Sequence, residues 1–246
     1  MICPCRWLAL SLPEPLPATV NPQPNAKSRD LAANIGVEFR TPEEYFLDQA
    51  PEPFSREFEP KDHLVRVVDA PPAPFTRRNK QDVVMFCGSP GAGKSTFYWG
   101  NLKPLDYERI NQDLLKTRDR CLKVARESLS AGRSVAIDNT NADPETRACW
   151  VRLAREFSVP IRCIHFTAPT RLCEHNDCVR ALNPDVMNPE GRVKLPGIAF
   201  RSFAQRFVAP SESEGFQDIV QVDFHFHGTD EQRQRWSQYW VSSFST

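Results

Sequence analysis

The chain has 246 residues, of which 40% are hydrophobic, and its 31 Lys and Arg residues balance 31 Asp and Glu residues. This length and apolar fraction allow one large domain, or a domain with an extension, around a packed core. A formal net charge of zero excludes binding to a polyanion through bulk charge, so such a partner would need a local basic patch.

The first third of the chain is rich in proline and predicts little regular structure. Residues 1–27 show no hydrophobic period and contain repeated prolines, which indicates a disordered tail. Residues 49–80 are again proline-rich and end in a basic cluster, which indicates a linker packed along the following domain.

Two short helices are expected between the tail and the linker. The first runs over Asp30–Gly36 and is closed by its glycine. The second begins after the N-cap Thr41, with Pro42 at its first position and Glu44 completing a capping box.

From residue 82 the pattern changes to strands that alternate with helices, which is typical of a parallel sheet with helices on both faces. The expected strands are 83–87, 108–111, 134–137, 161–166 and 219–226. The expected helices are 96–99, 114–131, 144–157, 170–182, 198–207 and a closing amphipathic helix through Trp236 to Phe244. Residues 183–196, which contain Arg192 and Lys194, are expected to form a mobile segment.

The first expected strand leads directly into Gly88–Ser95, which match G-x-x-x-x-G-K-[ST] without a gap. Such a loop curls tightly at its glycines, and its N–H groups hold phosphate oxygens at a helix N-terminus. Lys94 would contact the β- and γ-phosphates, and Ser95 would ligate Mg²⁺. A chance glycine-rich turn is the alternative, which the preceding strand and following helix disfavour. The expected nucleotide-binding residues are Gly88, Ser89, Pro90, Gly91, Ala92, Gly93, Lys94, Ser95 and Thr96.

The sequence therefore predicts an α/β fold, a P-loop NTPase-type parallel sheet flanked by helices, with a largely irregular N-terminal extension. ATP and Mg²⁺ are the expected cofactors.

Two further strand ends carry polar clusters, and ligands gather at strand carboxyl ends in open parallel sheets. Asp113 is our candidate for the base that accepts the acceptor's hydroxyl proton in phosphoryl transfer, and an N-cap is its alternative role. Asp138 would hold Mg²⁺ through water. Asn139, Thr140 and Asn141 would either position substrate phosphates or shape the turn.

Phosphoryl transfer also needs cations on the developing charge. Arg180, on the helix that leads into residues 183–196, is the candidate lid cation, with a solvated helix face as its alternative. Arg118, Arg120 and Arg147 are placed to meet a phosphate of the acceptor.

The eight cysteines form no CxxC pair, which indicates reduced thiols in an intracellular compartment. The spacing of the candidate zinc ligands Cys173, His175, Cys178, His225 and His227 fits no common zinc site. No apolar run is long enough to span a membrane, and Met1–Leu12 lacks the features of a signal peptide.

Together these motifs resemble the kinase domain of the polynucleotide kinase 3′-phosphatase family, in a fungal-like form. The matching stretches are GSPGAGKSTF, INQD, IDNTN, HNDCVRALN and AFRSFAQRFVAPSESEGF, within residues 82–226. The resemblance implies transfer of the ATP γ-phosphate to 5′-hydroxyl ends of DNA or RNA in strand-break repair, in the nucleus and alongside repair proteins. The implied roles fall on Asp113 (base), Lys94 and Ser95 (phosphate loop), Arg180 (lid) and Arg120 (acceptor side).

The family also carries a haloacid-dehalogenase-type phosphatase domain with an Asp-x-Asp nucleophile motif, and no Asp-x-Asp occurs in this chain. We therefore expect 3′-phosphatase activity to be absent. Residues 28–47 look like the tail of such a domain, as after a natural truncation or in a gene model that begins inside a lost domain. The expected units are residues 1–27 (tail), 28–48 (phosphatase remnant), 49–80 (linker) and 81–246 (P-loop polynucleotide kinase domain).

Two alternatives stay open from the sequence. One is a P-loop kinase of a small hydroxylated metabolite, and the other is a non-catalytic nucleic-acid-binding remnant. The presence of Lys94, Ser95 and Asp113 argues against the second.

Overall fold

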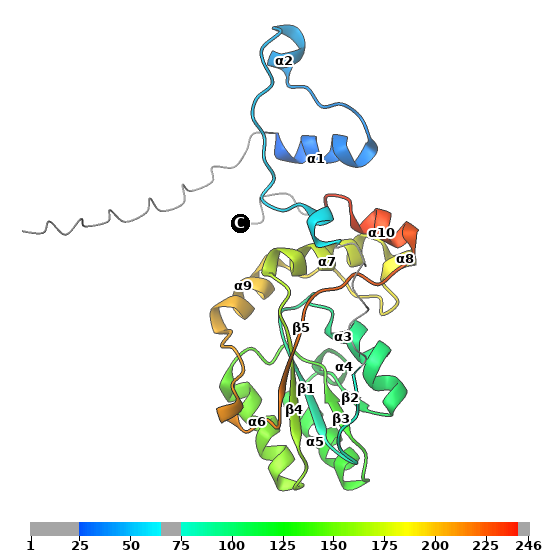
Figure 1. Cartoon of the computed structure of the whole chain (residues 1–246), viewed down its shortest axis with the longest axis vertical. Coiled ribbons are helices and arrows are strands. Elements are labelled where there is room, and N and C mark those ends of the chain that lie inside the picture. Colours follow the sequence, from blue (N-terminus) through cyan, green and yellow to red (C-terminus); the bar gives the residue numbers. More distant parts are fainter. Residues whose placement is uncertain (1–24, 65–74, 241–246) are drawn as a thin grey trace, which may run out of the picture.

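Five parallel strands form the centre of the protein in a computed structural model, which describes residues 25–64 and 75–240 (Figure 1). The strands are β1 (Val83–Cys87), β2 (Glu108–Ile110), β3 (Val135–Ile137), β4 (Ile161–Phe166) and β5 (Ile219–Val222). Their order across the sheet is β2-β3-β1-β4-β5, and all four pairings are parallel. The expected parallel sheet is confirmed, and the strand that carries the phosphate loop lies at its centre.

Helices cover both faces of this sheet. The helices that follow β1 in the chain are α3 (Lys94–Phe97), α4 (Gln112–Leu115), α5 (Arg118–Ser130), α6 (Pro144–Glu156), α7 (Thr170–Leu182), α8 (Pro184–Met187), α9 (Gly197–Arg206) and α10 (Asp230–Trp236). Shorter turns are η1 (Pro60–His63), η2 (Tyr98–Leu102), η3 (Lys103–Leu105) and η4 (Glu212–Glu214).

β1 lies at the centre of the sheet because its apolar side chains can be buried on both faces. All five of its residues are buried, and successive side chains enter opposite layers of the core, as the period of a strand requires. Met85 packs with the apolar side chains of α5 and α6, whereas Phe86 packs with an aromatic cluster that includes Phe97 and Phe166. The sheet is therefore held between two separate apolar layers.

The segment after β2 differs from the single helix expected over 114–131. α4 ends at Leu115, its C-cap Lys116 has a φ of 72°, and α5 starts anew after the N-cap Thr117. A lysine in the left-handed region cannot continue a right-handed helix. The break gives Asp113 a short helix of its own at the end of β2.

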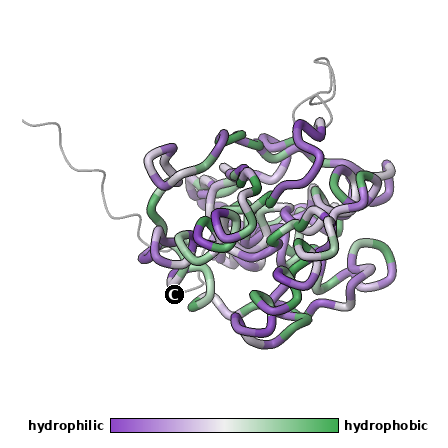
Figure 2. Tube along the Cα trace, turned by 90° about the horizontal axis from the view of Figure 1, so that it is seen from below, coloured by the Kyte–Doolittle hydropathy of each residue, from purple (hydrophilic) through white to green (hydrophobic). Residues whose placement is uncertain are grey.

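Some other boundaries also differ from those expected. The helix after the phosphate loop starts at Lys94 and continues through the π-helical turn η2. The last helix ends at Trp236, and the remainder of its expected span lies partly beyond the described residues. The 183–196 segment contains α8, and the last strand ends at Val222. Along the backbone, hydrophobic and hydrophilic residues are closely interleaved (Figure 2).

An N-terminal arm, residues 26–64, contains α1 (Ala26–Ile35), α2 (Pro42–Phe46) and η1. Gly36 ends α1 with φ 75°, and both hydrogen bonds of the expected capping box between Thr41 and Glu44 are present. Helix α1 begins earlier than expected, within the last residues assigned to the tail. Most of that tail, and part of the expected linker, lie outside the described residues.

The arm is fastened to the end of the described chain at Tyr239. Asn34 exchanges two hydrogen bonds with the backbone of Tyr239, at 2.8 and 3.0 Å. The Tyr239 hydroxyl donates to Glu59 at 2.7 Å, and the guanidinium of Arg56 lies 4.0 Å from the centre of its ring. We call these four side chains the clasp.

Candidate active site

The phosphate loop connects β1 to α3, and its glycines hold conformations that other residues rarely adopt. Gly91 has φ 76°, and a Cβ there would lie 2.2 Å from the carbonyl oxygen of Cys173 in α7. Gly93, the N-cap of α3, has φ 93°. Both positions therefore require glycine. The loop from Pro90 to Thr96 lines an open cavity of about 1540 Å³.

Lys94 is the cation of this loop and lies folded back onto it. Its side chain is buried, and Nζ donates to the carbonyl oxygens of Gly88 at 3.0 Å and Ser89 at 2.6 Å. Burial lowers the pKa of Lys94 to about 8, although the Asp138 carboxylate opposes this shift. A bound phosphate would raise this pKa again by adding negative charge nearby.

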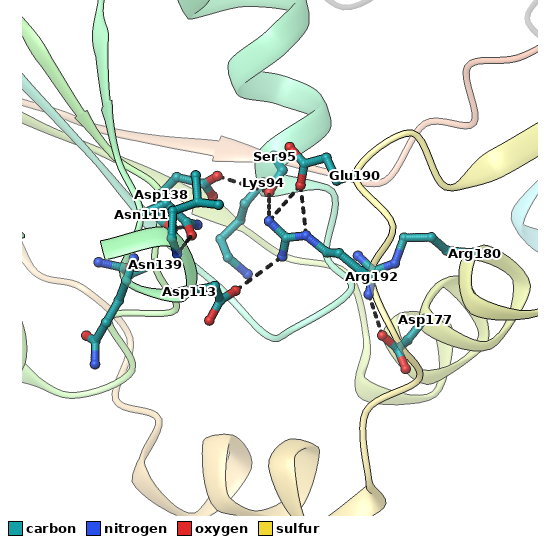
Figure 3. Close-up of polar contacts among 12 residues, drawn as sticks. Lys94, Ser95, Asn111, Asp113, Asp138, Asn139, Asp177, Arg180, Glu190 and Arg192 are labelled. Carbon is teal, nitrogen blue, oxygen red and sulfur yellow. Dashed lines mark hydrogen bonds and ion pairs between the residues drawn. The ribbon is translucent and has the colours of Figure 1, made fainter. Parts of the chain in front are cut away.

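Ser95 and Asp138 provide the oxygens that a magnesium ion would need. The Ser95 hydroxyl donates to Asp138 Oδ2 at 3.0 Å, and Asp138 is 2% exposed (Figure 3). A hydroxyl and a carboxylate, completed by phosphate oxygens and water, suit Mg²⁺. Arg109 also contacts Asp138, with Nε 2.8 Å from Oδ2. The residues present therefore fit the ion, with Asp138 already neutralised in part by an arginine.

Asp113 lies in the same cavity as the phosphate loop, at the carboxyl end of β2. Its side chain is 78% exposed, and its Oδ2 lies 3.4 Å from Nη1 of Arg192. The N-cap of α4 is Asn111, whose side chain accepts from the backbone N–H of Leu114 at 3.2 Å. The alternative role of Asp113 as an N-cap is therefore wrong, and its exposed carboxylate lines the cavity in an ion pair with Arg192.

The loop after β3 mostly shapes its own surroundings. Asn141 is buried, donates to the carbonyl oxygen of Phe86 at 2.7 Å and accepts from Trp150 at 3.2 Å. The carbonyl oxygen of Thr140 accepts from the Gly88 N–H at 3.0 Å. Asn139 and Thr140 line the cavity, but Asn139 also accepts from the backbone N–H that begins α4. The geometry favours turn-shaping for Asn141 in particular.

Arg147 is not part of the cavity, although the sequence predicts that it meets an acceptor phosphate. Its side chain is 0% exposed, and Nη2 lies 2.7 Å from a carboxylate oxygen of Glu214. Nη1 donates to the carbonyl oxygens of Asn141, Ala142 and Val208. The prediction for Arg147 is wrong because this arginine ties α6 to the turn before β5.

Other basic residues line the cavity near Asp113. Lys116 and Arg118 are exposed and line it, and Arg118 Nη2 donates to the hydroxyl of Thr146 at 3.4 Å. Arg120, two residues further along α5, is exposed but is not among the lining residues. The structure therefore brings a neighbour of Arg120, rather than Arg120 itself, to the site.

Arg180, the candidate lid cation, lines the cavity from α7 and pairs with Asp177 at 2.5 Å. The second oxygen of Asp177 accepts from the backbone N–H of Leu195 at 2.7 Å. Asp177 therefore holds both Arg180 and the end of the 183–196 segment in place.

Three residues reach the site that sequence reasoning did not assign to it: Arg109, Glu190 and Arg192. Arg109 bridges Asp138 and Glu190. Arg192 contacts both Ser95 and Asp113 (Figure 3). Arg192 was noted as a basic residue of a mobile segment, but its partners are far apart in the sequence. Their spacing gives no local signal, and contact prediction would be needed to find them.

The remaining chemistry-bearing residues form no second centre within the described chain. Residues 25–64 and 75–240 hold no group of three or more His, Cys, Asp or Glu side chains that could bind a metal. The six cysteines in those ranges are free thiols. Among the same residues, no helix has the length and apolar character to cross a membrane.

The chain is similar to several known proteins. A family model described as an AAA domain matches residues 83–120 and 114–210. The chain is 40% identical over 201 residues to the bifunctional polynucleotide phosphatase/kinase of Schizosaccharomyces pombe, an alignment that covers 81% of this chain and 48% of that protein. A second such protein, from Acanthamoeba polyphaga mimivirus, is 32% identical over 206 residues, which is 80% of this chain and 48% of the viral protein.

The chain thus spans about half the length of these two relatives. Their sequences confirm the resemblance drawn from the motifs. Among solved structures, Chaetomium thermophilum Kti12 in complex with ADP-AlF3 is similar with a TM-score of 0.46 and 13% identity, over 63% of this chain and 95% of that one.

Proposed function

The chain belongs to the AAA domain family, and we propose that it is an ATP-dependent polynucleotide 5′-hydroxyl kinase, with ATP and Mg²⁺ as cofactors. Its similarity to two bifunctional polynucleotide phosphatase/kinases supports this substrate class. The observation that carries the proposal is the presence of Asp113, Lys94 and Ser95 in one cavity. A phosphate grip, a metal-side hydroxyl and an exposed carboxylate are the parts that phosphoryl transfer to an alcohol requires.

The residues divide the work as follows. Lys94 and the loop N–H groups hold the β- and γ-phosphates, and Ser95 with Asp138 would hold the ion, which would neutralise charge on those phosphates when bound. Asp113 orients the acceptor hydroxyl and takes its proton as the new P–O bond forms. The bond between the γ-phosphorus and the bridging oxygen breaks, and ADP leaves.

A polynucleotide acceptor is supported by the local charge. The chain has no net charge, yet Lys116 and Arg118 stand on the acceptor side of the cavity. Arg206 also lines it and pairs with Asp143 at 3.1 Å. A cationic rim of this kind is the local basic patch that a nucleic acid backbone needs.

The test is transfer of labelled γ-phosphate to a 5′-hydroxyl oligonucleotide, set against a panel of nucleosides and sugars. We expect label on the oligonucleotide. DNA and RNA forms of the oligonucleotide are compared in the same assay. Label on a nucleoside or sugar alone would instead identify a small-molecule kinase, and binding of oligonucleotide without transfer would identify a non-catalytic module.

We further propose a role in DNA strand-break repair in the nucleus, alongside repair proteins. Because the chain contains no Asp-x-Asp motif, we also expect no removal of phosphate from a 3′-phosphate oligonucleotide. Release of inorganic phosphate from that substrate by the purified chain would contradict the expected absence of phosphatase activity. Exclusion of the tagged chain from nuclei would contradict the proposed role in nuclear repair.

A further inference from the structure

Residues 188–196, which we call the strap, carry an arginine into the centre of the site. Arg192 Nη2 donates to the hydroxyl of Ser95 at 3.2 Å, and Nη1 lies 3.4 Å from Oδ2 of Asp113 (Figure 3). The guanidinium therefore spans the gap between the metal-side hydroxyl and the proposed base. The γ-phosphoryl group must occupy this same gap during transfer.

A carboxylate in the strap holds this guanidinium in place. Glu190 accepts from Arg192 Nε at 2.8 Å, from Arg109 Nη1 at 2.7 Å and from the indole N–H of Trp99 at 2.7 Å. Burial alone would raise the pKa of Glu190, but its bonds to Arg109 and Trp99 outweigh burial and hold it at about 2. Glu190 thus stays charged, and it fixes the strap to both β2 and the turn after α3.

The backbone of Arg192 is fixed separately from its side chain. Asn188 is 8% exposed, and its amide accepts from the Arg192 N–H at 2.8 Å and donates to the Arg192 carbonyl oxygen at 2.7 Å. At the other end of the strap, Asp177 accepts from the Leu195 N–H. A side chain with its backbone bonded on both sides and its guanidinium anchored is preorganised.

Arg180 is engaged differently. Its Nη2 donates to the Asp177 carboxylate within its own helix, whereas the guanidinium of Arg192 donates to catalytic side chains. Both arginines line the cavity, as Lys94 does.

We infer that Arg192 is a catalytic residue that donates hydrogen bonds to the transferring phosphoryl group, with Glu190 and Asn188 as its positioning residues. The inference rests on the proposed kinase function. As the bond to ADP lengthens, negative charge spreads over the equatorial oxygens and the bridging oxygen, and a planar guanidinium can donate to two of them at once. In the free protein Ser95 and Asp113 hold the same donors in place.

The experiment compares Arg192→Ala, Arg192→Lys and Lys194→Ala in single-turnover transfer from ATP to a 5′-hydroxyl oligonucleotide. Lys194 is the matched control, because it is an exposed cation in the same strap. We expect Arg192→Ala to lower the rate at saturating ATP by about 10²–10³-fold, the cost of losing one preorganised donor to developing charge. Lysine should recover little of this loss, since it cannot donate in a fork, and Lys194→Ala should match the wild type.

Three further measurements separate catalysis from structure. The melting temperature and the ATP dissociation constant of Arg192→Ala should stay close to those of the wild type, and added guanidinium should restore part of its rate. Glu190→Gln, which keeps the shape but removes the charge, should lower the rate by about tenfold with an unchanged fold, on the scale of one lost charge-assisted contact.

The outcomes distinguish this inference from the proposed function. If the wild type transfers phosphate and the rate of Arg192→Ala is within about threefold of it, Arg192 is not catalytic, because a lost donor should cost roughly 10²-fold. The kinase proposal would still stand. A slow Arg192→Ala whose melting temperature or ATP affinity falls in step would also overturn the inference. If the wild type itself transfers nothing, the proposed function fails and the inference falls with it.

Discussion

Replacing Asp113 by asparagine should remove the proposed base while leaving the fold intact. The side chain is 78% exposed and its ion pair with Arg192 is 3.4 Å long, so the pair contributes little to stability after solvent screening. We expect the free energy of unfolding to change by less than about 0.5 kcal/mol, as for other surface substitutions. The rate of transfer should fall about 10²–10⁴-fold, which corresponds to about 2.7–5.4 kcal/mol of transition-state stabilisation.

The assay is single-turnover transfer of the γ-phosphate to a 5′-hydroxyl oligonucleotide at saturating ATP, with the ATP dissociation constant measured in parallel. Asp119→Asn is the matched control, because Asp119 is an exposed carboxylate in the first turn of the neighbouring helix α5. If Asp113→Asn bound ATP normally and transferred phosphate as fast as the wild type, the assignment of the base would be refuted.

Three other predictions follow from the geometry. Arg147→Ala should lower the free energy of unfolding by about 3–5 kcal/mol, because it leaves the Glu214 carboxylate without its buried partner; urea denaturation measures this, and a loss below about 1 kcal/mol would contradict the structural role. ATP affinity should fall as pH rises above about 8, because Lys94 then loses its proton in the free protein, whereas bound phosphate raises the pKa of Lys94. Calorimetry in two buffers near that pH should detect proton uptake when ATP binds, and proton release would contradict the prediction. Gly91→Ala should weaken ATP binding by about tenfold or more, since its Cβ would lie 2.2 Å from the Cys173 carbonyl oxygen and backbone strain of this kind costs about 1–3 kcal/mol; an unchanged dissociation constant would argue that the loop adapts.

Local patterns predicted most of the fold. The apolar run of β1 and the phosphate-loop motif are both continuous in sequence, and the capping box at Thr41 is a four-residue signal. Helix α7 has the expected bounds. The break at Lys116 was not predicted, because a lysine with positive φ leaves no pattern in the sequence.

The site was harder to predict, because side-chain partners are set by tertiary packing. In the sequence Arg147 cannot be distinguished from an exposed basic residue, because its burial depends on Glu214, 67 positions away. Glu190 and Arg109 meet across 81 positions, and each alone resembles a solvated charge. A single sequence identifies the groups that can do chemistry, but distant pairing determines which of them are available for it.

The clasp around Tyr239 bears on how the protein folds. Asn34 and Tyr239 are 205 positions apart, so their contact closes most of the chain into one loop. The entropic cost of closing such a loop grows only logarithmically with its length, but the chain loses this entropy before the contact can stabilise the folded state. We therefore expect the sheet to assemble first and the arm to dock last, so that pulse-labelled refolding would protect the amides of β1 well before those of α1.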